Sequence, residues 1–71
     1  MPYVNIKVTG GSEAPTQEQK VELITGVTEL LKRVLNKNPA TTVVVIDEVE
    51  MDNWGIGGET VTSLRRKKGS R

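Results

Sequence analysis

Pro2 directly follows Met1, so removal of Met1 would leave Pro2 as a free secondary amine at the N-terminus. The reference pKa of an α-amino group, about 7.7 to 8.0, lies closer to neutrality than those of Asp, Glu, Lys or Tyr side chains. The sequence has no His and no Cys, the side chains that most often act as bases or nucleophiles near neutral pH. Pro2 is therefore the natural candidate for acid–base chemistry, with an ordinary second-position proline as the alternative.

Three other groups of residues could suggest sites, and each has a simpler interpretation. Glycines after Trp54 match neither a P-loop nor a dinucleotide-binding fingerprint, and they indicate a turn that needs positive φ. Acidic residues near position 50 could hold a cation, but without other ligands they indicate a solvated strand end. Basic residues at the C-terminus favour a solvated terminus. The three groups are, in this order, Gly55, Gly57 and Gly58; Asp47, Glu48, Glu50 and Asp52; and Arg65, Arg66, Lys67, Lys68 and Arg71.

The elements that would position Pro2 begin with a strand over residues 3–9. Every second residue of this segment is apolar, as expected of a strand that is buried on one face. Those apolar residues are Val4, Ile6 and Val8. Residues 10–15 include two glycines and a proline and predict a loop.

A long helix is predicted from Gln17 to about Asn36. Thr16 and Gln19 fit a capping box at its start, and residues 36–39 end it because Asn tolerates a left-handed cap and the residue before Pro39 disfavours helix. Apolar residues recur at the three- and four-residue spacing of one helix face. They are Val21, Leu23, Ile24, Val27, Leu30, Leu31, Val34 and Leu35.

A second strand is predicted over Thr41 to Val49, where the continuous apolar run Val43 to Ile46 indicates burial on both faces. A strand, a crossover helix and a second strand favour parallel pairing in one sheet. Residues 54–58 predict a hairpin, and residues 60–64 a short strand or helical turn. The expected class is therefore α/β: a β-α-β subunit with two parallel strands, one long crossover helix and a C-terminal hairpin-like segment.

The chain is short enough to predict one domain, residues 1–71, with a small core. A domain of this size buries only about 60% of the surface of its unfolded chain, and without Cys or His it cannot add disulfides or a typical structural metal. Association with copies of itself is the remaining remedy. The net charge of +1, the shortness of the apolar run Val43 to Ile46 and the absence of a signal core predict a soluble cytoplasmic protein without membrane or general polyanion partners.

Three segments together resemble the 4-oxalocrotonate tautomerase family, in particular its 2-hydroxymuconate tautomerase-like bacterial members. These segments are Met1 to Val8, the pair Gln19-Lys20 that opens the helix, and Trp54 to Glu59. The resemblance covers residues 2–66 in order and spacing, with a longer loop at residues 10–15. It implies a homo-oligomer, commonly a hexamer, with an N-terminal proline as catalytic base and no metal or organic cofactor.

The resemblance implies that Pro2 takes a proton from the 2-hydroxyl of a dienol and returns one at a distant carbon, which converts 2-hydroxymuconate to its conjugated oxo acid. To be a free base near neutral pH, the amine needs a pKa lowered by apolar surroundings and nearby cations. Trp54 stands where the family has an aromatic pocket wall, although a core or interface aromatic is an equally valid role. Thr9 and Thr42 stand near the family's pocket.

The sequence departs from the family at two arginines that hold substrate carboxylates. The first-strand loop reads Gly10-Gly11-Ser12-Glu13 where one arginine is expected, and Val44 occupies the position of the other. An arginine fork binds a carboxylate through two charge-assisted hydrogen bonds and can stabilise developing enolate charge. If the substrate is a carboxylate, another cation must take over, and the candidates are Lys7, Arg65 and Arg66.

Two alternatives remain open from the sequence. The first is a small nucleic-acid-binding module that uses the basic tail from Arg65 to Arg71, against which stand two aromatic residues in all and a nearly neutral net charge. The second keeps the enzyme class and changes the reaction, because relatives of the expected fold also perform dehalogenation or hydration.

Overall fold

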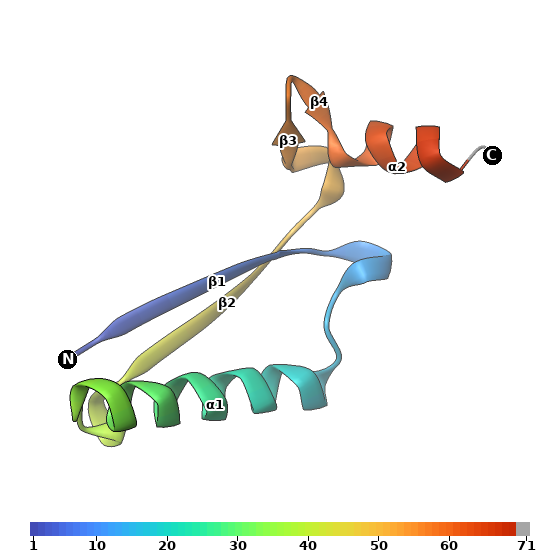
Figure 1. The fold of residues 1–71 in the computed structure, drawn as a ribbon. Helices are drawn as coiled ribbons and strands as arrows, with labels where there is room; N and C mark the ends of the chain where they lie inside the picture. Colours follow the sequence, from blue (N-terminus) through green and yellow to red (C-terminus); the bar gives the residue numbers. More distant parts are fainter. Residues whose placement is uncertain (70–71) are drawn as a thin grey trace. The chain divides into compact units, whose positions relative to one another are not determined.

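A computed structural model describes the backbone of residues 1–69 and the side chains of residues 1–67; the predicted tail residue Arg71 and the side chain of Lys68 lie outside the described residues. The main elements run in the predicted order (Figure 1). They are β1 (Tyr3–Thr9), α1 (Gln17–Leu35), β2 (Val43–Val49), β3 (Gly55–Ile56), β4 (Glu59–Thr60) and α2 (Val61–Gly69), with single 3-10 turns at Gly11–Glu13, Pro39–Thr41 and Met51–Asn53.

The chain divides into two compact units, which we describe separately. The first contains Met1–Lys7 and Pro15–Asp47, and the second contains Val8–Ala14 and the chain from Glu48 onward. The single domain of residues 1–71 therefore stays a prediction.

The strands β1 and β2 pair in a two-stranded sheet. At its start the amide of Val43 donates to the carbonyl oxygen of Pro2 over 3.0 Å, and at its end the amide of Gly10 donates to the carbonyl oxygen of Val49 over 2.7 Å. Both strands thus run in the same direction, while α1 returns alongside them (Figure 1). The predicted parallel β-α-β arrangement is confirmed.

The ends of α1 follow the local sequence. The Thr16 hydroxyl accepts a hydrogen bond from the Gln19 amide over 3.1 Å, and the Gln19 side chain accepts one from the Thr16 amide over 2.8 Å. These two bonds satisfy backbone donors that a helix start leaves unpaired. Asn36 ends the helix in the left-handed conformation, with φ of 55°. The predicted capping box and C-terminal cap are confirmed.

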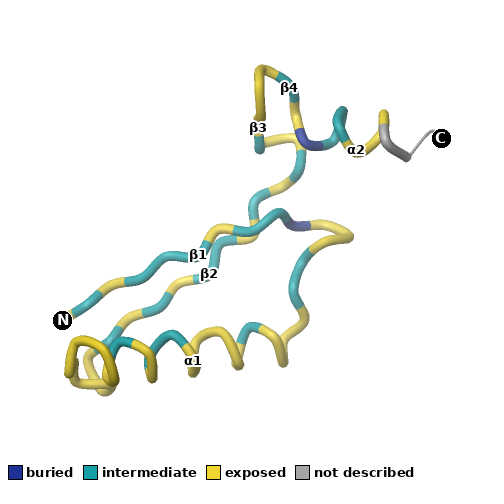
Figure 2. The backbone as a smooth tube through the Cα atoms, viewed as in Figure 1, coloured by how far each residue is buried: buried dark blue, intermediate teal, exposed yellow. Residues whose placement is uncertain are grey.

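The sheet of the first unit is covered on one face only. Val44 and Ile46 are half-buried, whereas Val43 and Val45 on the opposite face are 43% and 36% exposed (Figure 2). The prediction that this run is buried on both faces is therefore wrong for a single chain. The strand also begins at Val43 instead of Thr41, because the Asn38 side chain accepts from the Ala40 amide over 3.0 Å and stabilises a 3-10 turn before it.

In the second unit, β3 and β4 form the predicted hairpin. Gly55 pairs with Thr60 and Ile56 pairs with Glu59 in antiparallel register. Gly57 and Gly58 connect them with φ values of 60° and 87°, the conformation that a two-residue hairpin loop requires. The loop predicted at residues 10–15 contains one 3-10 turn, Gly11–Glu13.

The helix α2 extends the short strand or helical turn predicted at residues 60–64 through the basic residues, whose described side chains are exposed. The Thr60 hydroxyl accepts a hydrogen bond from the Ser63 amide over 3.1 Å, which caps the helix start. The Val61 amide donates to the Trp54 carbonyl oxygen over 2.8 Å, and the Val61 side chain is only 4% exposed. This anchor and cap allow the basic residues that follow to continue as helix to Gly69.

Candidate functional site

Pro2 lies at the start of β1, half-buried, with its carbonyl oxygen bound by the Val43 amide. Met1 precedes it and is 91% exposed. While Met1 is attached, the Pro2 nitrogen is an amide and cannot act as a base. Removal of the exposed Met1 would create the amine without disturbing the hydrogen bond that anchors Pro2.

Thr42 lies at the same end of the sheet as Pro2, because the next residue, Val43, is the hydrogen-bond partner of Pro2. Its side chain is half-buried, and its hydroxyl donates to the Asn38 carbonyl oxygen over 2.9 Å. The structure thus brings together two of the residues predicted for the site. The Thr42 hydroxyl keeps its own lone pairs available as acceptors.

Lys7 is not brought to Pro2 within one chain. Five residues of extended strand, roughly 16 Å, separate the two positions. The Lys7 ammonium forms an ion pair of 3.0 Å with Asp47, which also accepts a hydrogen bond of 2.8 Å from the Asn5 amide group. The bond from Asn5, followed by the bond and charge of Lys7, holds the pKa of the Asp47 carboxyl below its usual value of 3.8.

The second unit brings Thr9 and Arg65 together through Glu13. The Thr9 hydroxyl donates to Oε1 of Glu13 over 2.6 Å. Arg65 binds both carboxylate oxygens, with Nε 2.9 Å from Oε2 and Nη2 3.2 Å from Oε1. The bond from Thr9, followed by the bond from Arg65, lowers the pKa of the Glu13 carboxyl from its usual 4.5. We call Thr9, Glu13 and Arg65 the carboxylate clamp.

Glu13 is the residue that the sequence reasoning missed. The sequence predicts a loop at this position, where an acidic side chain is ordinary. The signal was the distance of four residues from Thr9 across a turn, which allows a hydroxyl and a carboxylate to meet; the partner 52 residues further along has no local signature.

Trp54 and Arg66 also belong to the second unit. Trp54 is half-buried, and its carbonyl oxygen accepts the Val61 amide that starts α2. Arg66 is exposed and has no hydrogen bond or ion pair among the described residues. Whether Trp54 walls a substrate pocket and Arg66 contacts substrate stays a prediction.

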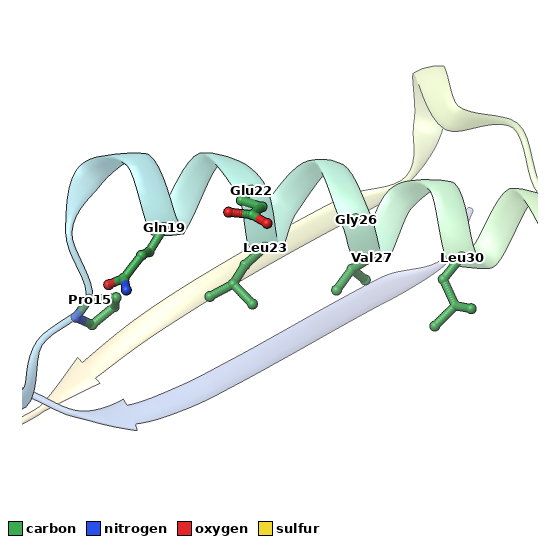
Figure 3. Close-up of a pocket in the computed structure, with 7 residues that line it drawn as sticks. All are labelled: Pro15, Gln19, Glu22, Leu23, Gly26, Val27 and Leu30. Atoms are coloured by element: carbon green, nitrogen blue, oxygen red, sulfur yellow. The ribbon is translucent and has the colours of Figure 1, made fainter.

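A cavity of about 540 Å³ is an open groove on the first unit. Leu23, Val27 and Leu30 line it from α1, beside Pro15 and Gln19 (Figure 3). A second cavity, of about 390 Å³, lies between the 3-10 turns and the start of α2 in the second unit, where the Thr62 hydroxyl donates to Asp52. Neither lining includes a residue predicted for the site, so an apolar helix face is the better description of the larger groove.

No group of three or more acidic side chains that could hold a metal ion occurs among the described residues. Asp47 is instead engaged by Asn5 and Lys7, and Asp52 by Thr62. At least two of the four acidic residues near position 50 therefore have protein partners, while Glu50 is exposed as the predicted solvated strand end requires. The described residues also include no helix long and apolar enough to cross a membrane.

Comparison with known proteins places these observations in a family. A family model described as tautomerase enzyme matches residues 2–64, so the match begins at Pro2. A probable tautomerase K2 of Dickeya dadantii is 63% identical over 67 residues, covering 94% of this chain and 97% of the relative. A 2-hydroxymuconate tautomerase of Bacillus subtilis is 33% identical over 64 residues, covering 90% of this chain and 98% of the relative. The crystal structure of DmpI from Helicobacter pylori superposes with a TM-score of 0.83 at 52% identity, covering 92% of this chain and 97% of that one.

Proposed function

The chain belongs to the tautomerase family and is an enzyme with tautomerase activity, and on that premise we propose that it ketonises 2-hydroxymuconate or a related unsaturated 2-hydroxy acid. The observation that carries the proposal is Pro2, the first residue of the family match, at the anchored start of β1 in a chain without His or Cys. The 33% identical relative described as a 2-hydroxymuconate tautomerase supports this substrate class.

In the proposed mechanism, Pro2 acts first as base and then as acid. With Met1 removed, its nitrogen takes the proton of the 2-hydroxyl while the oxygen electrons form the C2 carbonyl and the double bonds shift along the chain. The resulting ammonium then gives a proton to the distant carbon, so that the substrate is isomerised with no net gain or loss of protons. Trp54 and Thr42 would line the pocket, and the reaction as written needs no cofactor.

The proposal includes a homo-oligomer, with a hexamer as the expected size. Among the described side chains, Val61 is the only apolar one that is buried, whereas α1 and the sheet expose many. The exposed apolar residues of the first unit include Val21, Ile24, Leu30, Val34, Val43 and Val45. A second copy of the chain can cover such faces, and most soluble oligomers are symmetric assemblies of identical chains. The cytoplasmic location stays a prediction.

The nucleic-acid alternative receives little support from the charges of α2. Arg65 is paired with Glu13, and Lys67 forms an ion pair of 2.6 Å with Glu59. Among the described cations of this helix, only Arg66 has no anionic partner. Paired cations release fewer counterions and contribute less to polyanion binding.

The test is a spectrophotometric assay of 2-hydroxymuconate ketonisation by the protein with a verified Pro2 N-terminus. We expect turnover above the uncatalysed rate that Pro2→Ala reduces and retained Met1 abolishes. Turnover that is equal in the Met1-retaining protein would refute Pro2 as the base. Absence of turnover with a verified Pro2 terminus would refute the proposed substrate class.

A further inference from the structure

We propose that Glu13 is a positioning residue that presents Arg65 to the distal carboxylate of the substrate, the one farther from the 2-hydroxyl. The proposal rests on the proposed function, because it names the group that would recognise one end of a dicarboxylate. It concerns the carboxylate clamp, whose three members lie in one compact unit.

The geometry of the clamp leaves one edge of Arg65 available. Glu13 engages Nε and Nη2, the inner edge of the guanidinium, with bonds of 2.9 and 3.2 Å. Among the described residues Nη1 has no hydrogen-bond partner, and the Arg65 side chain is 52% exposed. A guanidinium offers five N–H donors, so the outer edge formed by Nη1 and Nη2 can still bind a second carboxylate with two parallel hydrogen bonds.

Thr9 fixes Glu13 in turn. Its hydroxyl donates to the same Oε1 that accepts from Nη2, which leaves the carboxylate little freedom to rotate away from Arg65. The lowered pKa of Glu13 keeps this carboxylate charged at neutral pH. A long arginine side chain loses several rotamers on binding a ligand, and a partner that fixes it in advance removes part of that cost.

An ion pair between β4 and α2 supplies a matched control. Glu59 forms an ion pair of 2.6 Å with Lys67 and also accepts from the Ser63 hydroxyl, so it has the same three-part arrangement as the clamp. Its side chain is 42% exposed, close to the 36% of Glu13. Glu59→Gln therefore removes an equivalent ion pair from α2 without touching Arg65.

The experiment compares KM and kcat for 2-hydroxymuconate and for its analogue without the distal carboxylate. We expect Arg65→Ala to raise KM for the dicarboxylate about tenfold, and Glu13→Gln about three- to fivefold, with kcat nearly unchanged. KM for the analogue should respond to neither substitution, and Glu59→Gln should change KM for neither substrate. In an Arg65→Ala background, Glu13→Gln should cause no further rise in KM for the dicarboxylate, since the effects of two residues that act as one unit are not additive.

A spectroscopic measurement makes the outcome independent of turnover. In the wild type, NMR should show a distinct, slowly exchanging Arg65 Nε–H signal that titrates with fumarate, a non-reacting dicarboxylate, and Glu13→Gln should weaken both features. If the wild type shows no turnover of 2-hydroxymuconate but its Arg65 Nε–H signal still titrates with fumarate, the proposed function is refuted and the clamp is supported as a carboxylate site. An Nε–H signal and fumarate affinity unchanged in Glu13→Gln would overturn the positioning role, and so would an equal rise in KM for both substrates.

Discussion

The carbonyl oxygen of Pro2 accepts a hydrogen bond of 3.0 Å from the amide of Val43. This bond extends the pairing of β1 with β2 to the second residue of the chain. An amine at Pro2 would therefore be fixed by the sheet. The pyrrolidine ring adds stiffness, because it fixes φ of that residue. A catalytic base needs such fixed geometry before its pKa matters.

The first prediction concerns the residue that blocks this amine. Protein that retains Met1 should lose nearly all tautomerase activity, because an amide nitrogen has no basic lone pair. Pro2→Ala should keep part of the activity, since processing would leave a primary amine in the same place. Mass spectrometry must define the N-terminus of each sample, and Pro15→Ala serves as a proline substitution outside β1.

The second prediction concerns assembly. Val45 is 36% exposed on the uncovered face of the sheet, beside Val43. Val45→Lys should lower the oligomer's stability and shift the protein toward smaller species in sedimentation at micromolar concentration, because a charge would be buried against the second copy. Val45→Thr keeps the branched shape and should sediment nearly as the parent does. A well-folded wild-type monomer at that concentration would contradict the proposed homo-oligomer.

Local signals in the sequence were sufficient for most of the fold. The Thr16 and Gln19 capping box, the left-handed Asn36 and the glycine pair Gly57-Gly58 each specify a turn or helix end through residues a few positions apart. Such features depend on nearest neighbours, so they can be predicted without knowing the tertiary structure. The apolar periodicity then supplied the order of strand, helix and strand.

The features that could not be predicted from the sequence depend on contacts between residues far apart in the chain. The pairing of Glu13 with Arg65 joins residues 52 apart, and the continuation of α2 depends on the anchoring of Val61 to Trp54. Val43 and Val45 show a different limit. The continuous apolar run predicts burial on both faces, but within one chain only one face of the described sheet is covered. Of the predicted site, Pro2 and Thr42 meet at one sheet end, and Thr9 and Arg65 meet at the clamp.

The third prediction concerns the start of α1. Thr16→Ala removes the hydroxyl that accepts the Gln19 amide and should destabilise the protein by about 1 kcal/mol, the usual cost of losing such a cap. Thr25→Ala is the control, because Thr25 lies exposed inside the same helix and gains helix propensity when replaced by Ala. Urea denaturation at one fixed protein concentration measures both, since the midpoint of an oligomer depends on concentration.

The last prediction is the pH dependence of the pair formed by Asp47 with Asn5 and Lys7. The folded state holds the pKa of Asp47 below its usual value of 3.8, so it favours the ionised carboxyl. The resulting stabilisation is present above 3.8 and is lost as pH falls through the lowered folded value. Asp47→Asn should therefore unfold at lower urea than wild type at neutral pH, and the difference should shrink below the usual pKa.

Two partners, Asn5 and Lys7, lower the pKa of Asp47, and each can be removed separately. The hydrogen bond from Asn5 lowers the pKa of Asp47 more than the bond or charge of Lys7 does. Asn5→Leu and Lys7→Met should each raise the pKa of Asp47, followed by carboxyl NMR, because each removes a partner of the ionised carboxyl. Glu29→Gln on the exposed face of α1 is the control for the denaturation series, because Glu29 has no hydrogen bond or ion pair among the described residues. A stability difference between wild type and Asp47→Asn that stays constant down to the acid transition would show that the ionised carboxyl contributes nothing to folding.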